Sequence, residues 1–299
     1  MNQDIYFIDK PRVRAAFGRA ANTYDGAAIV QKLVCDEMLS RLDLVKIRPK
    51  IILDAGCGTG VASVDLQNRF RMSQVVSLDF AQGMLAQTRK TILNASISTK
   101  LKRIFGFSKE ALVCADIEAL PLVDNAVGLV WSSLAIQWCN DLDAAFSEFN
   151  RVLHPEGLLM FSTFGPDTLK ELRTATAEAT QNTSVSRFID MHDIGDALVR
   201  AGFSAPVLDV ERFTLTYDDV KKVMRDLKSI GAYNATEGRA RGLMGRGFLQ
   251  KLETAYERFR DNDKLPATFE VVYGHAWKVA SKANVDDGFS PITFKPRNK

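Results

Sequence analysis

The chain has 299 residues, of which 46% are hydrophobic and 25% are charged, and its formal net charge is +3. These values are typical of a globular protein with one large domain, and so small a positive charge gives no support for nucleic acid as the partner. Apolar runs stay well short of the roughly 20 residues needed to cross a bilayer, and the first ten residues lack a signal-peptide core.

Cysteine and histidine are too few and too scattered to form a disulfide framework or a zinc site. The four cysteines, with no CxxC pair among them, are Cys35, Cys57, Cys114 and Cys139. The three histidines stand at positions 154, 192 and 275. We therefore expect reduced thiols, no metal, no membrane or nucleic-acid partner, and a cytoplasmic location.

The first 48 residues predict a helical arm ahead of the main fold. Over residues 10–20, arginines surround Val13 and Phe17 in an amphipathic pattern. Over residues 25–42, apolar side chains recur at helical spacing, so this stretch should be a helix that packs on the core.

From residue 49 to residue 163, short apolar runs alternate with helical patterns. The expected strands cover residues 50–54, 74–79, 111–115, 126–132 and 157–163, and the expected helices cover residues 61–70, 81–93 and 143–153. Such alternation predicts an α/β fold with a doubly wound, Rossmann-like sheet. Ligands of such a sheet bind at the carboxyl ends of its parallel strands.

Beyond residue 163 the alternation is interrupted. Further helices are expected over residues 168–180, 193–201, 217–230, 240–244 and 247–261, and two late strands over residues 205–211 and 267–273. We expect one domain made of four parts. These are the arm (1–48), the cofactor-binding core (49–163), a helical cap with late core elements (164–250), and a final helix, strand and tail (251–299).

One segment is longer than a connection requires. The stretch from Ser96 to Lys109 carries four cations around three apolar residues. It reads either as a solvated surface insertion or as a docking patch for an acidic partner, because clustered cations speed encounter with an anionic surface.

A glycine-rich turn is the most informative motif. The apolar run of the first strand ends at Asp54 and is followed by Gly56, Gly58 and Gly60 at alternate positions. Asp79 ends the next strand, 19 residues past the last of these glycines, the offset at which a βαβ unit presents a carboxylate to a ribose diol. This turn resembles that of class I S-adenosylmethionine (SAM) methyltransferases more than the GxGxxG turn of dinucleotide binders.

In a SAM site, Asp54 would orient the ammonium group of the cofactor, although it can also cap the helix that follows. Asp79 would accept hydrogen bonds from the ribose hydroxyls. Phe80 and Met84 would line the adenine slot, with core packing as the alternative for the methionine. The glycines would let the backbone approach the ligand closely.

Two further strand ends complete the expected cofactor site. Asp116 follows the third strand and can accept from the adenine amine, while Ile117 can pack on the ring; helix capping is the alternative for the acid. Ser132 ends the fourth strand, and Gln137 and Trp138 after it open the reaction face or pack between helix and sheet.

Six segments of this sequence resemble the malonyl-acyl-carrier-protein O-methyltransferases of biotin synthesis. They cover residues 17–25 (FGRAANTYD), 133–138 (SLAIQW), 162–173 (STFGPDTLKELR), 188–196 (FIDMHDIGD), 226–236 (DLKSIGAYNAT) and 268–277 (TFEVVYGHAW). Together they span nearly the whole chain, and those after residue 160 are more specific than the shared SAM core.

The resemblance implies methyl transfer from SAM to the free carboxylate of a malonyl thioester, carried by acyl carrier protein or by coenzyme A. No general base is expected, because a carboxylate with a pKa of about 4 is already ionised at neutral pH. Tyr24, Phe188 and Lys228 match family motif positions and would hold the carboxylate. The reserve candidates are Arg173, Arg225 and His192.

The implied carrier protein is strongly acidic. Arg12, Arg14 and Arg19 of the arm, together with the cations between Lys100 and Lys109, would attract it.

Three other functions remain open from the sequence. Assembly hydroxylases of mitochondrial complex I share this fold and parts of the tail but hydroxylate a protein arginine. A small-molecule or quinone methyltransferase, and a non-catalytic SAM-binding assembly factor, are the other two. The absence of a transit-peptide composition at the N-terminus favours the methyltransferase over the mitochondrial hydroxylase.

Overall fold

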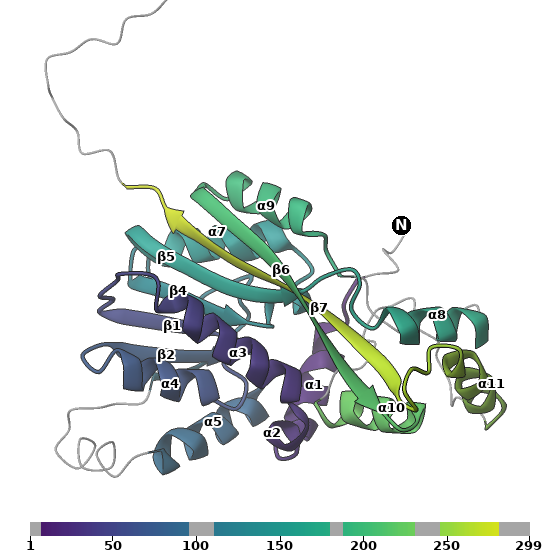
Figure 1. Cartoon of the computed structure of the whole chain (residues 1–299). Coiled ribbons are helices and arrows are strands. Elements are labelled where there is room, and N and C mark those ends of the chain that lie inside the picture. The colour runs from purple at the N-terminus through teal and green to yellow at the C-terminus, as the bar shows by residue number, and fades with distance from the viewer. Residues whose placement is uncertain (1–6, 96–110, 180–187, 231–245, 281–299) are drawn as a thin grey trace, which may run out of the picture.

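The fold is given by a computed structural model that describes residues 7–95, 111–179, 188–230 and 246–280 (Figure 1). The expected helix over residues 240–244 and the segment from Ser96 to Lys109 lie outside these ranges. Within them, no helix is both long enough and apolar enough to cross a membrane.

The elements alternate along the chain as the sequence predicts. The strands are β1 (Ile51–Ala55), β2 (Gln74–Asp79), β3 (Ala111–Cys114), β4 (Val127–Ser133), β5 (Leu153–Phe164), β6 (Phe203–Tyr217) and β7 (Leu265–Lys278). The helices are α1 (Lys10–Ala20), α2 (Tyr24–Ala27), α3 (Ile29–Leu42), α4 (Val61–Arg69), α5 (Gln82–Asn94), α7 (Leu142–Val152), α8 (Lys170–Ala179), α9 (Met191–Arg200), α10 (Val220–Ser229) and α11 (Arg246–Glu257). A short 3-10 helix, η1 (Ile136–Trp138), follows β4.

The strands form one seven-stranded sheet in the order β3-β2-β1-β4-β5-β7-β6. The first five strands are parallel, whereas β7 runs antiparallel to β5, and β6 runs antiparallel to β7. The order reverses between β1 and β4, and a crevice for a ligand opens at such a switch point, beyond the carboxyl ends of the strands. The predicted doubly wound, Rossmann-like class is confirmed.

Each face of the sheet is covered by helices, and this buries the alternate residues of its strands on both sides (Figure 1). Ile52, Trp131 and Met160 belong to the core that includes α3 and α4. Leu53 and Val130 belong to the other core, which includes α7 and α9. Burial on both faces explains why these strands read as continuous apolar runs in the sequence.

The β6–β7 pair extends beyond the other strands, and α8, α10 and α11 gather at its far end (Figure 1). Buried residues on this extension join the first core through Leu265, Ala267 and Phe269 of β7 and Val223 of α10. These helices lie where the sequence predicts a cap, and the four-part division of the chain stays a prediction.

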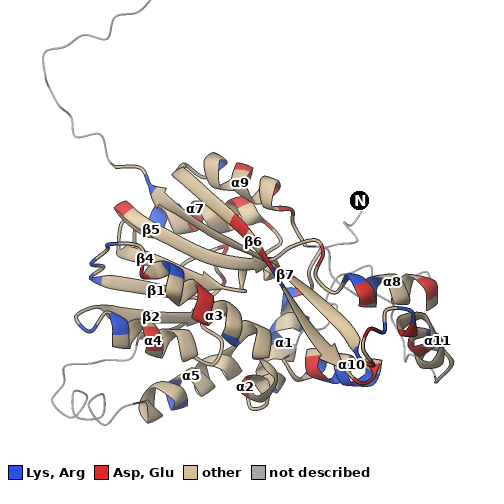
Figure 2. Cartoon of the chain, in the orientation of Figure 1, with Lys and Arg blue, Asp and Glu red and all other residues tan. Residues whose placement is uncertain are grey.

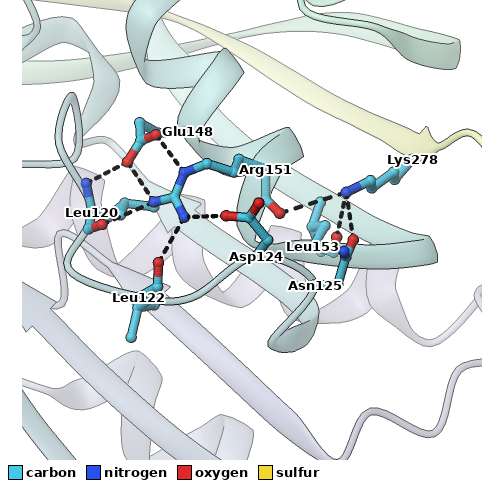
Figure 3. A network of polar contacts seen from close by, with 8 residues as sticks. All are labelled: Leu120, Leu122, Asp124, Asn125, Glu148, Arg151, Leu153 and Lys278. Carbon is cyan, nitrogen blue, oxygen red and sulfur yellow. Dashed lines mark hydrogen bonds and ion pairs between the residues drawn. The ribbon is translucent and has the colours of Figure 1, made fainter.

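A polar network holds the loop between β3 and β4 (Figure 3). The guanidinium of Arg151 donates to the carbonyl oxygens of Leu120 and Leu122 at 2.9 and 2.7 Å, and to Glu148 Oε1 at 2.7 Å. The other carboxylate oxygen of Glu148 accepts from the Leu120 N–H at 2.6 Å. Because the same loop begins with two of the predicted cofactor contacts, this network helps to fix that side of the site.

Several predicted elements differ from the structure. β5 begins at Leu153 and not at residue 157, β7 covers Leu265–Lys278 and not only residues 267–273, and Tyr217, expected in a helix, ends β6. Three further corrections have an identifiable local cause. The expected single helix over residues 25–42 is interrupted at Ala28, whose ψ of 46° is not helical. Asp25 accepts from Thr59 Oγ1 at 2.6 Å. This contact holds α2 against the glycine turn, so α2 and α3 do not form one continuous helix.

The other two corrections concern the later part of the chain. β6 is longer than the expected strand over residues 205–211, and Ala205 has a φ of +47° within a register shift. α8 begins at Lys170 and not at Thr168, because Thr168 Oγ1 donates to the Glu270 carbonyl at 2.9 Å and is held by β7.

Candidate active site

A pocket with about 620 Å³ of empty space lies at the carboxyl ends of the parallel strands. Three parts of the chain line it: the glycine turn, the segments after β2, β3 and β4, and the N-terminal arm. The lining residues include Lys10, Phe17, Tyr24, Gly56, Gly58, Asp79, Phe80, Met84, Asp116, Ile117, Leu134, Ala135, Trp138 and Cys139.

The glycines of the turn serve different purposes. Gly56 and Gly58 both have positive φ, at +83° and +55°. A Cβ on Gly56 would lie 2.3 Å from the Cβ of Ala135, so this glycine is required for packing. A Cβ on Gly58 would meet nothing within 4 Å, because this residue faces the open pocket. Gly60 does not line the pocket; its Cβ would meet Thr88 of α5 at 2.5 Å.

Asp79 lies at the floor of the pocket and is only 6% exposed. Its carboxylate accepts from the N–H of Gly58 at 3.0 Å and from the N–H of Ala81 at 2.7 Å. Burial raises the pKa of this acid to about 6, although both hydrogen bonds oppose the shift. Each carboxylate oxygen has a second lone pair, so the group can still accept from a ligand hydroxyl.

Asp54 and Ser132 lie behind the pocket and do not line it. Asp54 is 1% exposed, and its carboxylate accepts from Ser63 Oγ in the first turn of α4 at 2.5 Å. Burial and the nearby charge of Asp79 raise the pKa of Asp54 to about 7. The Ser132 hydroxyl donates to the Ala55 carbonyl at 3.0 Å and joins β4 to β1. The predicted contact of Asp54 with an ammonium group stays a prediction.

The predicted adenine-side residues are brought together in this pocket. Phe80, Met84, Asp116 and Ile117 all line it. Sequence reasoning missed Lys10, whose ammonium donates to Asp116 Oδ2 at 2.5 Å and also to Glu118. Nothing local to Lys10 in the sequence signals this contact, because its partners lie more than a hundred residues away.

The arm closes the pocket from above. The ring of Phe17 packs against those of Trp138, Phe80 and Tyr24, with centroids 5.2, 6.2 and 6.4 Å apart. This cluster covers part of the pocket and limits the access of water to that side, and a drier site strengthens the electrostatic contacts inside.

Tyr24 contributes a phenol to the wall of the pocket. Its pKa is raised by burial and by the negative charges of Asp79 and Asp25. The hydroxyl therefore stays protonated at neutral pH and can donate a hydrogen bond to an anionic ligand.

A second cavity, with about 1480 Å³ of empty space, adjoins the first across the segment from Leu134 to Cys139. Cys139 lines both cavities. Phe188 lines this second cavity and packs against Phe164, with ring centroids 5.6 Å apart.

The structure does not bring every candidate residue to a cavity. Lys228 is exposed on α10 and is absent from the lining of both cavities; the next residue, Ser229, accepts from Thr23 Oγ1 at 3.2 Å. Arg225 is likewise exposed on α10. His192 pairs with the helix-capping Asp190 at 2.6 Å and is 80% exposed.

The residues present fit the predicted cofactor. Gly58 leaves room beside the buried Asp79, which is the arrangement that a ribose needs. Cys57 is buried, and burial raises the pKa of its thiol, so it fills space and is not poised as a nucleophile. Over the described ranges, no cluster of three or more His, Cys, Asp or Glu side chains could hold a metal ion.

Known proteins resemble this chain in sequence. The family described as a methyltransferase domain matches residues 53–161. A malonyl-[acyl-carrier protein] O-methyltransferase of Methylovorus sp. (strain MP688) is 63% identical over 99% of this chain and 98% of its own length. The enzyme of the same name from Laribacter hongkongensis (strain HLHK9) is 55% identical over 98% of both chains.

Solved structures share the fold at much lower identity. The YcgJ protein of Bacillus subtilis has a TM-score of 0.56 and 11% identity, covering 82% of this chain and 98% of its own. A protein of Bacillus halodurans C-125 described as a methyltransferase also has a TM-score of 0.56, with 16% identity and coverage of 82% and 99%. Such distant likeness shows the fold alone.

Proposed function

The chain belongs to the family of malonyl-acyl-carrier-protein O-methyltransferases, and we infer that it transfers a methyl group from SAM to the free carboxylate of malonyl-acyl carrier protein. The observation that carries this inference is the close relationship to enzymes of that name along almost the whole chain. The same relationship disfavours the arginine hydroxylase, assembly-factor and quinone-methyltransferase alternatives.

The cofactor is SAM, and the pocket beside the glycine turn is the place that we propose for it. Asp79 would accept from the ribose hydroxyls, and Asp116 and Ile117 would contact the adenine. Because Gly58 has no side chain, the ligand could approach the backbone closely at this residue. When bound, SAM supplies a methyl group that is activated by its sulfonium centre.

The reaction needs positioning more than proton transfer. One oxygen of the malonyl carboxylate forms the new C–O bond as the C–S bond of the donor breaks, which leaves a methyl ester and a neutral thioether. No proton moves, because the carboxylate is ionised at neutral pH. What the protein supplies is alignment of the two reactants and a site from which water is excluded.

We assign the positioning of the carboxylate first to Tyr24. Its protonated hydroxyl lies in the wall of the cofactor pocket and can donate to an anion. Phe188 would provide an apolar wall on the adjoining cavity. Lys228 would have to reach in from α10, so its role needs movement of that helix or of its side chain.

Two carriers are possible for the malonyl group. Acyl carrier protein is the carrier in the names of the relatives, and malonyl-coenzyme A is the alternative carrier. Methylation would remove the negative charge of the malonyl group, so that the thioester could serve as a primer for the pimeloyl chain of biotin. A cytoplasmic location fits this use and stays a prediction.

The test is transfer of labelled methyl from SAM by the purified protein. Malonyl-acyl carrier protein, malonyl-coenzyme A, succinyl-coenzyme A and acetyl-acyl carrier protein would be offered in parallel. We expect labelling of the malonyl thioesters and none of acetyl-acyl carrier protein, which has no free carboxylate. Equal labelling of the acetyl and malonyl carriers would refute carboxyl methylation.

A further inference from the structure

The second cavity contains a guanidinium that the cofactor pocket does not use. Arg173, in the first turns of α8, lines this cavity. One of its terminal nitrogens donates to the carbonyl oxygens of Pro166 and Thr168, each at 2.6 Å. Its Nε is fully buried and has no hydrogen-bond partner. A buried donor without a partner is costly, so the protein alone leaves the hydrogen-bonding capacity of this guanidinium incomplete.

The charge of Arg173 is not balanced by an acid in the described part of the chain. The acids nearest in sequence are engaged elsewhere. Glu171 accepts from Thr268 N–H and Oγ1 at 3.1 and 2.5 Å. Asp167 and Glu270 both pair with Arg212, at 3.1 and 2.9 Å.

Two carboxylates line the same cavity, but both lie at its exposed rim. Asp190 is 52% exposed and bonds His192. Asp193 is exposed on the first turn of α9. Neither forms an ion pair with Arg173. Among the described residues the guanidinium therefore has no acidic partner, in a cavity whose wall mixes apolar side chains with neutral polar ones. A cation in a partly buried wall attracts an anion more strongly than one in water does.

Neutral polar groups connect this cation to the cofactor pocket. Gln137 and Thr163 line the second cavity. The Gln137 amide donates to the carbonyl of Leu134, a residue that lines the cofactor pocket, and accepts from Thr163 Oγ1 at 3.3 Å. The two cavities thus adjoin at the segment from Leu134 to Cys139, and Cys139 lines both.

We propose that Arg173 binds the malonyl carboxylate and makes the enzyme selective for an anionic acyl group; this rests on the function proposed above. The free N–H groups of the guanidinium hold one carboxylate oxygen, and the other oxygen remains available for the methyl group. Because part of the guanidinium is already bound to the two backbone carbonyls, the carboxylate is held without full bidentate pairing and keeps its nucleophilicity. Arg173 is in this view a substrate-positioning residue.

The experiment compares the binding of malonyl- and acetyl-acyl carrier protein, with S-adenosylhomocysteine present so that no transfer occurs. We expect the wild-type enzyme to bind the malonyl form about 10- to 100-fold more tightly, the range for one charge-assisted contact. In Arg173→Gln this ratio should fall about tenfold or more, and the preference that remains is assigned to the Tyr24 hydroxyl. Arg200→Gln, which removes an exposed arginine paired with Asp143, should leave the ratio unchanged.

A merely structural role would lower both affinities together and keep their ratio, so an unchanged ratio in folded Arg173→Gln overturns the proposal. If that variant does not fold, Arg173→Lys decides. A single ammonium cannot reproduce the fork, so the ratio should fall about three- to tenfold, and a wild-type ratio would overturn the proposal. Labelled methyl transfer by the wild-type enzyme distinguishes this outcome from failure of the proposed function. If the proposed function is wrong, no malonyl thioester is labelled; if only the role of Arg173 is wrong, labelling persists.

Discussion

Asp54 and Asp79 are buried acids whose pKa values lie near 7 and 6, mainly because burial disfavours their charged forms. In the unfolded chain an aspartate has a pKa of about 3.9. The folded protein therefore binds protons more readily than the unfolded chain does. Their ionisation costs stability above the folded pKa, and this cost disappears as the pH falls toward 4.

Replacement of one of these acids should separate stability from ligand binding. Without SAM at pH 8, Asp54→Asn should raise the free energy of unfolding by at least about 1 kcal/mol, because the buried charge is gone. The gain should shrink toward zero by about pH 4, and SAM should bind at least about tenfold more weakly. Urea unfolding and calorimetric titration measure the two effects, with the exposed Asp193→Asn as control. A gain that does not vary with pH would contradict the shifted pKa.

The Tyr24 hydroxyl should act on the acyl substrate and not on the cofactor. Tyr24→Phe should lower kcat/KM for malonyl-acyl carrier protein about 10- to 100-fold, since one hydrogen bond to a charged group is lost. SAM affinity should change by less than about threefold. Tyr217→Phe, on β6, is the matched control and should keep full activity. Loss of SAM binding in the Tyr24 variant would instead assign this residue to the cofactor.

At the scale of single elements, the N-terminal arm covers the cofactor pocket and is attached to the core at two points. α1 is attached through Lys10, whose pKa is raised although burial opposes the charge, because Asp116 and Glu118 accept its hydrogen bonds. A second attachment lies just before the helix, where Ile8 N–H donates to Asn140 Oδ1 at 2.7 Å. These two attachments hold the arm over part of the pocket.

Weakening of the attachment through Lys10 should therefore speed local opening of α1 and dissociation of SAM, with little effect on the overall fold. In Lys10→Met, amide hydrogen exchange in α1 should be about tenfold faster, and SAM should dissociate about three- to tenfold faster. The exposed Lys46→Met should behave as the wild type in both measurements. Unchanged exchange in α1 would mean that ring packing by Phe17 is enough to hold the arm.

Elements and site residues were predictable where local pattern decides their structure. β1 and β4 are buried on both faces, so they appear as apolar runs, and Gly56, Gly58 and Asp79 follow directly from such runs. β6 lies at the sheet edge, where burial is incomplete, and its length depends on pairing with β7, so the pattern predicted only residues 205–211, in its first half.

Contacts between distant parts of the chain left no local signal. The end of α2 is set by the bond from Thr59 to Asp25, and the environment of Lys10 is set by acids that follow β3. From the sequence, Arg173 was only a reserve candidate for holding the carboxylate. The residues beside it in the sequence do not indicate that its side chain lines a cavity. Lys228, placed by motif, lies instead on an exposed helix face.

For the whole molecule, the net charge of +3 is a small surplus spread over many elements, with acidic residues between the basic ones (Figure 2). Steering of an acidic carrier protein then depends on where the cations lie and not on their sum. Arg12, Arg14 and Arg19 are exposed on α1, the helix that covers the cofactor pocket. A carrier attracted to this helix would deliver its acyl group close to the reaction site.

Removal of these charges should affect encounter and not chemistry. The triple variant Arg12→Ser, Arg14→Ser, Arg19→Ser should raise KM for malonyl-acyl carrier protein about three- to tenfold, weaken the dependence of kcat/KM on salt, and leave kcat nearly unchanged. The variant Lys46→Ser, Arg48→Ser, Arg71→Ser removes three exposed cations that precede β1 and β2, at the opposite edge of the sheet. Both variants lose the same net charge, so only placement distinguishes them. Steady-state kinetics from low to high salt would compare the two, and equal effects would mean that overall charge, and not the arm, attracts the carrier.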